Sequence, residues 1–276
     1  MNINSRPAAV AGMFYPESAA VLARNVSQML SSAAQSPGLH PKAIIAPHAG
    51  YVYSGSVAAS IYAPLLTLRG MIRRIVLLGP THRVAIDGLA LPAATAFATP
   101  LGTVPIDRLL VDAVKDMPQI VVSDAAHAQE HSLEVQLPFL QSVFGTDSDS
   151  FSLLPLAVGD ATPEQVAEVL ERLWGGEETL IVVSTDLSHF LPYVQAQQVD
   201  EQTVQMILEL APTIVHQQAC GATPVNGLLL AAQRHGLRAQ LIDHRNSGDT
   251  AGDRSRVVGY GAFAFCADKS EALRDV

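Results

Sequence analysis

Histidines follow short apolar runs at two places in the chain. His48 comes two residues after the run 43–46, and His82 comes four residues after the run 74–78, with Pro and Gly within three residues of both. Pro and Gly fix the chain direction and allow the backbone to approach a ligand closely. Ligands in open α/β sheets bind beyond the carboxyl ends of the strands. We therefore expect these two imidazoles to meet in one site.

A carboxylate beyond a third apolar run can complete a metal site. Asp249 follows Gly248 in a polar turn after the run 239–243. Two imidazoles and one carboxylate on one face of a metal form the facial triad of non-haem Fe(II) enzymes, which leaves positions open for substrate and O₂. The pattern predicts that His48, His82 and Asp249 bind Fe(II). The other interpretation of Asp249 is an ordinary turn residue.

Two further segments carry reactive side chains. Asp186 and His189 follow the apolar run 179–184, and Cys220 precedes Gly221. His189 can serve as an acid or base beside a metal, but Asp186-x-x-His189 also fits a local hydrogen-bonded turn. Cys220 can offer a thiol to a pocket, although a buried, inert cysteine is the commoner case.

A competing motif lies between these segments. His127-x-x-Glu130-His131 matches the inverted zinc-peptidase pattern, in which a helix presents two imidazoles on one face and Glu130 acts as general base. This motif predicts a zinc hydrolase, but only three residues are fixed, and residues 123–126 resemble a helix entrance. If the helix holds, His131 and Glu134 share a face beside an apolar stripe, and both can contribute to a pocket.

Strands and helices must alternate to position these residues. Strands are predicted at 43–46, 74–78, 89–91, 152–158, 179–184, 239–243 and 257–265, and helices at 18–31, 54–66, 107–115, 131–144, 163–174, 195–210 and 224–235. No linker divides the chain. The pattern predicts an α/β fold in a single domain, residues 1–276 with a core of about 6–266, in which helices cover a central mostly parallel or mixed sheet.

Composition excludes several classes of protein. The 276 residues include 17 Lys and Arg against 26 Asp and Glu, a net charge of −9, which argues against a nucleic-acid partner. The apolar runs are far shorter than the ~20 residues of a membrane span. The N-terminus lacks a secretory signal, and two cysteines fit a reducing compartment. We expect a cytoplasmic protein whose partner is a small molecule or a peptide.

Several motifs, taken in order, resemble one family. They are Arg6-Pro7-Ala8 to Pro16, Ala46-Pro47-His48-Ala49-Gly50-Tyr51, Gly79-Pro80-Thr81-His82, Glu130-His131-Ser132-Leu133-Glu134 to Phe139, Ser184-Thr185-Asp186-Leu187-Ser188-His189, Cys220-Gly221 and Asn246-Ser247-Gly248-Asp249. Together they span nearly the whole chain, and they resemble the Memo family, whose prokaryotic members are known as AmmeMemoRadiSam system protein B.

The resemblance implies a fold like that of the class III extradiol ring-cleaving dioxygenases. By motif, His48 and His82 then fall on metal ligands, His189 on a catalytic acid or base, and His131 on a pocket histidine. Asp249 falls where those dioxygenases use glutamate and some Memo proteins carry cysteine. An oxygen ligand there favours Fe(II), whereas a thiolate would favour copper. Four further residues are expected in or behind the pocket: Tyr51, Glu134, Asp186 and Cys220.

These observations favour a non-haem metal-dependent oxidoreductase of dioxygenase type. Its substrate would be small, and aromatic if the resemblance extends to the dioxygenases. The second hypothesis is a metal- or peptide-binding adaptor without turnover, because animal Memo proteins resemble signalling adaptors. The third is the zinc hydrolase described above. The family name also implies a functional link to a radical-SAM protein.

Overall fold

A mixed sheet forms the centre of the molecule. The computed structural model describes residues 4–34, 38–147 and 149–267. Within these ranges nine strands form one sheet in the order β10-β12-β2-β9-β3-β8-β4-β7, and β11 pairs with β12. The strands β2, β9, β3 and β8 run parallel, whereas β12 is antiparallel to β2 and β4 is antiparallel to β8. The predicted α/β class with a mixed central sheet is confirmed.

The bounds of the elements are as follows. The strands are β1 (Ser5–Arg6), β2 (Ala43–Ala46), β3 (Arg74–Pro80), β4 (Leu89–Leu91), β5 (Ala96–Thr99), β6 (Gly102–Pro105), β7 (Ile120–Val122), β8 (Ser152–Val158), β9 (Thr179–Ser184), β10 (His189–Leu191), β11 (Leu237–Asn246) and β12 (Val257–Ala267). The α-helices are α1 (Ala19–Ser32), α2 (Tyr51–Tyr62), α3 (Arg108–Val114), α4 (Asp124–Ala128), α5 (Leu137–Phe144), α6 (Pro163–Leu173), α7 (Tyr193–Leu208), α8 (Ala222–Arg234) and α9 (Ser247–Thr250). Short 3₁₀ helices cover Ala63–Leu68 and Glu134–Gln136. A small sheet pairs β5 with β1 and β6.

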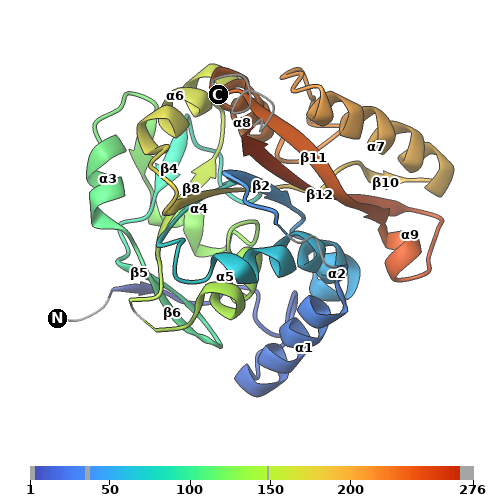
Figure 1. Ribbon diagram of the computed structural model, residues 1–276, viewed down its shortest axis with the longest axis horizontal. Coiled ribbons are helices and arrows are strands. Elements are labelled where there is room, and N and C mark those ends of the chain that lie inside the picture. Colours follow the sequence, from blue (N-terminus) through green and yellow to red (C-terminus); the bar gives the residue numbers. More distant parts are fainter. Residues whose placement is uncertain (1–3, 35–37, 148, 268–276) are drawn as a thin grey trace, which may run out of the picture.

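Helices cover both faces of the central sheet (Figure 1). Ile44 of β2 packs in the apolar core on the side of α1, α2 and α5, while its neighbour Ile45 packs in the core on the side of α6, α7 and α8. Successive side chains of a strand point to opposite faces, so strands buried on both sides must be apolar throughout. This explains why β2, β8 and β9 appear in the sequence as continuous apolar runs.

The main difference from the predicted elements lies before α5. The sequence pattern predicts a helix from His131, but helical structure starts with the 3₁₀ turn at Glu134 and continues as α5. The backbone N–H groups of His131 and Ser132 instead donate to the side chain of Glu130. These two N–H groups precede the helical turns and have no acceptor within a helix, so the Glu130 carboxylate serves as their partner.

The parallel strands β2, β3 and β9 all end at the same edge of the sheet. His48, His82 and Asp186 lie in the loops that follow them, and the N-terminus of α8 approaches the same edge through a contact between Gly221 and Thr185. Separately, among the described residues no helix is both long and apolar enough to cross a bilayer.

Candidate metal centre

Two histidines and a cysteine meet at the edge of the central sheet where β2, β3 and β9 end. His48 follows β2, His82 follows β3, and Cys220 precedes α8. One potential donor atom from each residue lies within 4.8 Å of the other two. The Cys220 sulfur is 3.2 Å from Nε2 of His48, and the centres of the two imidazole rings are 5.3 Å apart. These three side chains can together hold one metal ion.

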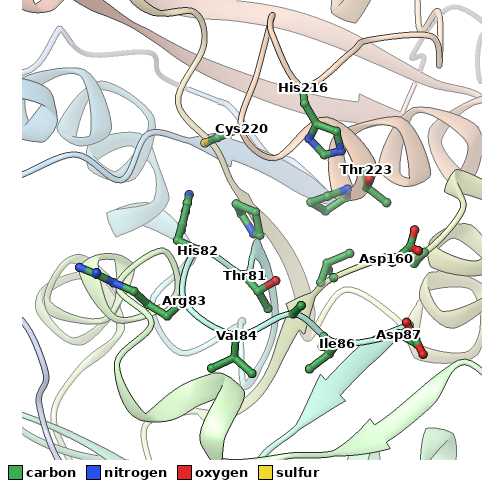
Figure 2. Close-up of a pocket in the computed structure, with 16 residues that line it drawn as sticks. Thr81, His82, Arg83, Val84, Ile86, Asp87, Asp160, His216, Cys220 and Thr223 are labelled. Atoms are coloured by element: carbon green, nitrogen blue, oxygen red, sulfur yellow. The ribbon is translucent and has the colours of Figure 1, made fainter.

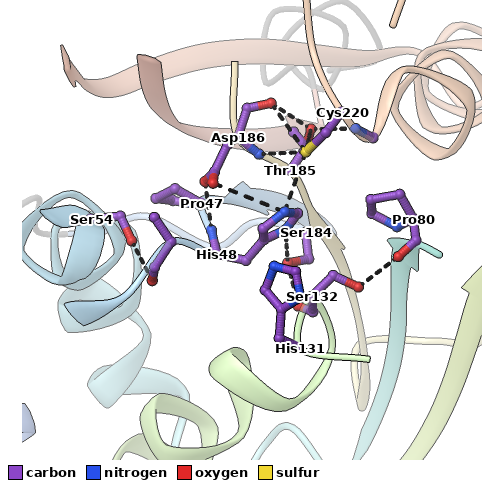
Figure 3. Close-up of polar contacts among 12 residues, drawn as sticks. Pro47, His48, Ser54, Pro80, His131, Ser132, Ser184, Thr185, Asp186 and Cys220 are labelled. Atoms are coloured by element: carbon purple, nitrogen blue, oxygen red, sulfur yellow. Dashed lines mark hydrogen bonds and ion pairs between the residues drawn. The ribbon is translucent and has the colours of Figure 1, made fainter. Parts of the chain in front are cut away.

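Cys220 is held in place by the loop after β9. The backbone N–H of Asp186 donates to the Cys220 sulfur, and the N–H of Gly221 donates to the hydroxyl of Thr185 (Figure 3). A Cβ atom at residue 221 would lie 2.8 Å from the Thr185 side chain, so glycine permits this close approach. Burial raises the pKa of the Cys220 thiol to about 12. The thiol is therefore protonated at neutral pH unless a metal ion displaces its proton.

The tautomer of His48 follows from its buried neighbours. The hydroxyl of Ser184 donates to the carbonyl of Ser132 and accepts from the side-chain amide of Gln136. Because its one proton is used, Ser184 can only accept from Nδ1 of His48, 3.0 Å away. Nδ1 therefore carries the proton, and Nε2 presents a lone pair toward Cys220. Burial, and then the neighbouring histidines, hold the pKa of His48 well below its usual value.

His82 is the most exposed of the three donors. Its side chain is 27 % exposed, and its Nδ1 lies 2.8 Å from the buried carboxylate of Glu130. Burial raises the pKa of Glu130, but hydrogen bonds from His82 and Ser132 outweigh it and bring the pKa down to about 2. A second group of potential donor atoms consists of His82, Glu130 and His131.

A cavity of about 470 Å³ opens beside the histidines. The polar side chains that line it include those of His131, His189 and Asp186. Its walls are largely aromatic, from Phe14, Tyr53, Phe190 and Tyr260, and Arg256 lies over the ring of Phe190. Burial lowers the pKa of His131 to about 4 and also lowers that of His189. Burial raises the pKa of Asp186 to about 7.

A second cavity of about 680 Å³ reaches the donors from another side (Figure 2). Cys220, His82 and His216 line it, together with Thr223 at the start of α8. A third, of about 600 Å³, lies between His82, His189, His216 and Cys220. The donor cluster is therefore accessible from several directions, and small molecules can reach it without opening the core.

Asp249 does not join His48 and His82. It is the third residue of the short helix α9, where its carboxylate accepts from the backbone N–H of Asn246 and from the hydroxyl of Tyr193. Among the described residues, the potential donor groups around His48 and His82 do not include it. The physical reason is that its oxygens cap α9. The structure instead places the sulfur of Cys220 beside them as the third potential donor.

The zinc-peptidase pattern does not form a zinc site. Helix α4 ends at Ala128, so His127 and His131 do not share a helical face. His127 is buried, and its Nε2 donates to the carbonyl of Ala90. The structure groups His131 and Glu130 with His82 rather than with His127.

Glu134 and Tyr51 lie behind the site rather than in it. The buried carboxylate of Glu134 accepts hydrogen bonds from Arg6, from Tyr15 and from the backbone N–H groups of Ala9 and Val10. The hydroxyl of Tyr51 donates to the carbonyl of Val135. These contacts hold the N-terminal segment 6–15 against the segment 127–135. The centre of the Phe14 ring lies 4.7 Å from the centre of the His131 ring.

The sequence of this chain matches a known family. Residues 6–264 match the family model described as Memo-like protein. The chain belongs to the Memo-like family. Similar proteins include MEMO1 family proteins of Ignicoccus hospitalis and Aquifex aeolicus, each 35 % identical over 94 % of this chain and 98 % of the relative. A MEMO1 family protein of Methanopyrus kandleri is also 35 % identical, with the same coverage of both chains.

A solved structure is also similar to this Memo-like chain. An uncharacterised protein of Escherichia coli, JW3007, superposes with a TM-score of 0.53 over 80 % of this chain and 98 % of its own. Its sequence is only 14 % identical, so the likeness concerns the fold alone.

Several residues of the Memo-like site are not evident from spacing. Ser184 and Gln136 fix His48, although both look like ordinary core positions in the sequence. His216 lies in a segment without a convergent motif, yet it lines two cavities beside Cys220. Ser184 alone had a local signal, because it is a polar residue at the end of an apolar strand.

Proposed function

We propose that this Memo-like protein binds a redox-active transition metal ion through His48, His82 and Cys220 and oxidises a small substrate. One observation carries the proposal: potential donor atoms of two imidazoles and one thiol lie within 4.8 Å of one another. A cavity lined by two further histidines, His131 and His189, lies beside them. Such donors suit transition metals and not the hard cations Mg²⁺ and Ca²⁺. The thiol favours copper over iron, whereas an Asp249 ligand would have favoured Fe(II).

The metal, when bound, would supply Lewis-acid and one-electron chemistry that side chains lack. The protein supplies proton handling. Nδ1 of His189 donates to the carbonyl of Leu187, so its Nε2 is left as an acceptor. Because burial lowers the pKa of His189 and of His131, both rings are neutral at pH 7 and can accept a hydrogen bond from a substrate hydroxyl.

The cavity of about 470 Å³ supports a flat, largely apolar substrate. The rings of Phe14, Tyr53, Phe190 and Tyr260 line its walls. Aromatic side chains stack on flat rings. The polar lining residues His131, His189 and Asp186 would orient a hydroxyl group of the substrate toward the metal donors. A small aromatic compound with ring hydroxyl groups therefore suits the cavity.

Metal titration and oxygen uptake test the proposal. The metal-free protein is titrated anaerobically with Cu(I), Fe(II) and Zn(II), and each loaded form is then given O₂ and a panel of catechols. We expect tight binding in the wild type and a loss of at least about 100-fold in affinity in His48→Ala and His82→Ala. His235→Ala is the control, because that ring stacks on Trp174 away from the site.

Unchanged metal affinity in both histidine variants would overturn the ligand assignment. Metal binding without oxygen consumption by any substrate would instead favour the adaptor without turnover. An apolar surface near the N-terminal segment is available for such an adaptor, since Met13 and Val52 are 72 % and 73 % exposed beside a groove of about 560 Å³.

A further inference from the structure

Glu130 is the residue of the zinc-peptidase pattern that the proposed function does not use. It is almost completely buried, in the turn between α4 and the 3₁₀ helix at Glu134. The fixed residues of the pattern predict a general base, and the donor grouping with His82 and His131 suggests a metal ligand. Its hydrogen bonds support neither role.

Both carboxylate oxygens of Glu130 already accept hydrogen bonds from the protein. Oε1 lies 2.8 Å from Nδ1 of His82 and accepts the backbone N–H groups of His131 and Ser132 at 2.9 and 2.8 Å. Oε2 accepts the backbone N–H of His82. A carboxylate offers about four lone-pair positions, and four donors point at this one. Oε1 accepts three of these donors, so a metal ion or a substrate proton that approached this oxygen would have to displace one of them, whereas Oε2 accepts a single N–H.

Glu130 contacts both the backbone and the imidazole of His82, and together the two contacts fix the orientation of the ring. One oxygen holds the backbone of His82, and the other faces Nδ1 of its imidazole. Because an ionised carboxylate only accepts hydrogen bonds, Nδ1 must carry a proton, and in the neutral imidazole Nε2 then presents a lone pair. His48 reaches the same tautomer through the neutral hydroxyl of Ser184. The two imidazoles thus present equivalent nitrogen atoms.

We propose that Glu130 is a positioning residue that fixes the His82 ring with its proton on Nδ1 and Nε2 free for the metal. The inference rests on the proposed metal-binding function for its purpose. A carboxylate behind a ligating histidine sets its tautomer and raises its basicity, and loss of such a partner costs about 10- to 100-fold in metal affinity.

The first test reads the tautomer without any metal. Long-range ¹H–¹⁵N NMR spectra of the metal-free protein distinguish an Nδ1–H from an Nε2–H imidazole, and His82→Ala identifies the His82 signals. We expect the Nδ1–H form in the wild type and a mixture of tautomers in Glu130→Ala. Glu130→Gln keeps an acceptor carbonyl and should keep the Nδ1–H form, which makes it the conservative rescue variant.

The second test measures affinity for Zn(II) and Cu(I). We expect Glu130→Ala to bind about 10- to 100-fold more weakly than the wild type, and Glu130→Gln to recover most of this loss. Asp124→Asn is the matched control, because this carboxylate of the same segment also accepts backbone N–H groups, those of Ala93 and Ala94, but contacts no histidine of the site. It should leave both the tautomer and the affinity unchanged.

The outcomes separate this inference from the proposed function. An Nε2–H form of His82 in the wild type overturns the inference, and so does wild-type affinity in Glu130→Ala. A loss in both Glu130 variants as severe as in His82→Ala also overturns it, since it would make Glu130 a ligand. If the wild type binds neither metal, the proposed function fails, while the tautomer data still test the orientation of His82. If Glu130→Ala does not fold, the tautomer of His82 in the wild type and the tautomer and metal affinity of Glu130→Gln still test the inference.

Discussion

The thiol of Cys220 lies among groups that keep it neutral in the absence of a metal. Burial raises its pKa to about 12, and the nearby Asp186 acts in the same direction. Replacement of the proton by a metal ion would relieve this cost, because a coordinating thiol is deprotonated outright. Metal binding at this site should therefore release a proton to the solvent.

The variants Cys220→Ser and Asp249→Asn test which of these two residues is the third metal ligand. The serine hydroxyl has nearly the shape of the thiol but is a poor metal ligand, so we expect metal affinity to fall at least about 100-fold. Asp249→Asn should keep wild-type affinity, since that carboxylate caps α9. Isothermal titration with Cu(I) measures both. A larger loss in Asp249→Asn than in Cys220→Ser would restore the carboxylate triad.

These two residues show the limits of spacing as a guide to the site. The rule that strand ends carry ligands selects His48, His82 and Asp186, which the structure brings together. It also selects Asp249, but a strand end does not show whether a carboxylate is already used by the backbone. Asn246-x-x-Asp249 resembles a capping box, the signal that could have revealed this use. No comparable pattern marks Cys220, whose position depends on the packing of α8.

His127 makes a pH-dependent contribution to stability. Burial lowers its folded pKa from 6.5 to about 4, so the unfolded chain binds more protons between these values and stability falls as pH falls. We expect the stability of wild type relative to His127→Gln to decrease by about 3 kcal/mol from pH 7 to pH 4. Guanidinium unfolding of the metal-free proteins over this range measures it. A pH-independent difference would contradict the shifted pKa.

At the scale of elements, the first turn of α8 determines where the thiol lies. In Gly221→Ala the new Cβ would lie 2.8 Å from the Thr185 side chain, so α8 and the loop after β9 must separate. We expect a loss of stability of about 1–3 kcal/mol and metal affinity at least about tenfold weaker. Thermal unfolding and metal titration measure the two effects.

Gly227→Ala on the same helix is the matched control. Its Cβ would lie 2.4 Å from the side chain of Val166, where α8 packs on α6. Stability should fall by a similar amount while metal affinity stays near the wild-type value. Equal losses of affinity in the two variants would show that general loosening, rather than the position of Cys220, controls binding.

The predictability of the elements follows from their burial. The strands 43–46, 152–158 and 179–184 were predicted with correct bounds, because strands covered on both faces are apolar throughout. Strands β1 and β7, of two and three residues, carry too little pattern to be seen in the sequence. The predicted helix start at His131 was wrong, since helical structure begins at Glu134, and apolar spacing does not show where the first turn of a helix starts.

At the scale of the whole molecule, one buried ion pair joins the N-terminal segment to the body. Arg6 contacts the carboxylate of Glu134 and the carbonyls of His127 and Glu130, and both side chains are nearly fully buried. Arg6→Met leaves the Glu134 carboxylate buried without its cation, so we expect a loss of about 3–5 kcal/mol in urea unfolding. A loss below about 1 kcal/mol would contradict this role.

Adding Glu134→Gln to Arg6→Met tests the cause of that loss. The second change removes the unpaired charge, while the single amide oxygen still accepts from one of the two backbone N–H groups, that of Ala9 or that of Val10. We expect the double variant to be more stable than Arg6→Met alone, because leaving one charge of a buried pair costs more than removing both. Additive losses would indicate that packing, and not charge, holds the segment.

The strand order also determines when the metal donors can come together during protein synthesis. Strand β9 lies between β2 and β3 and pairs with both. The strands that precede His48 and His82 are therefore joined in one sheet only after residues 179–184 have been inserted between them. Cys220 is 172 positions beyond His48. A nascent chain that has exposed both histidines to the cell therefore has no complete site. A metal ion that binds to all three side chains would therefore enter the site only after residues 48 to 220 have been synthesised and folded.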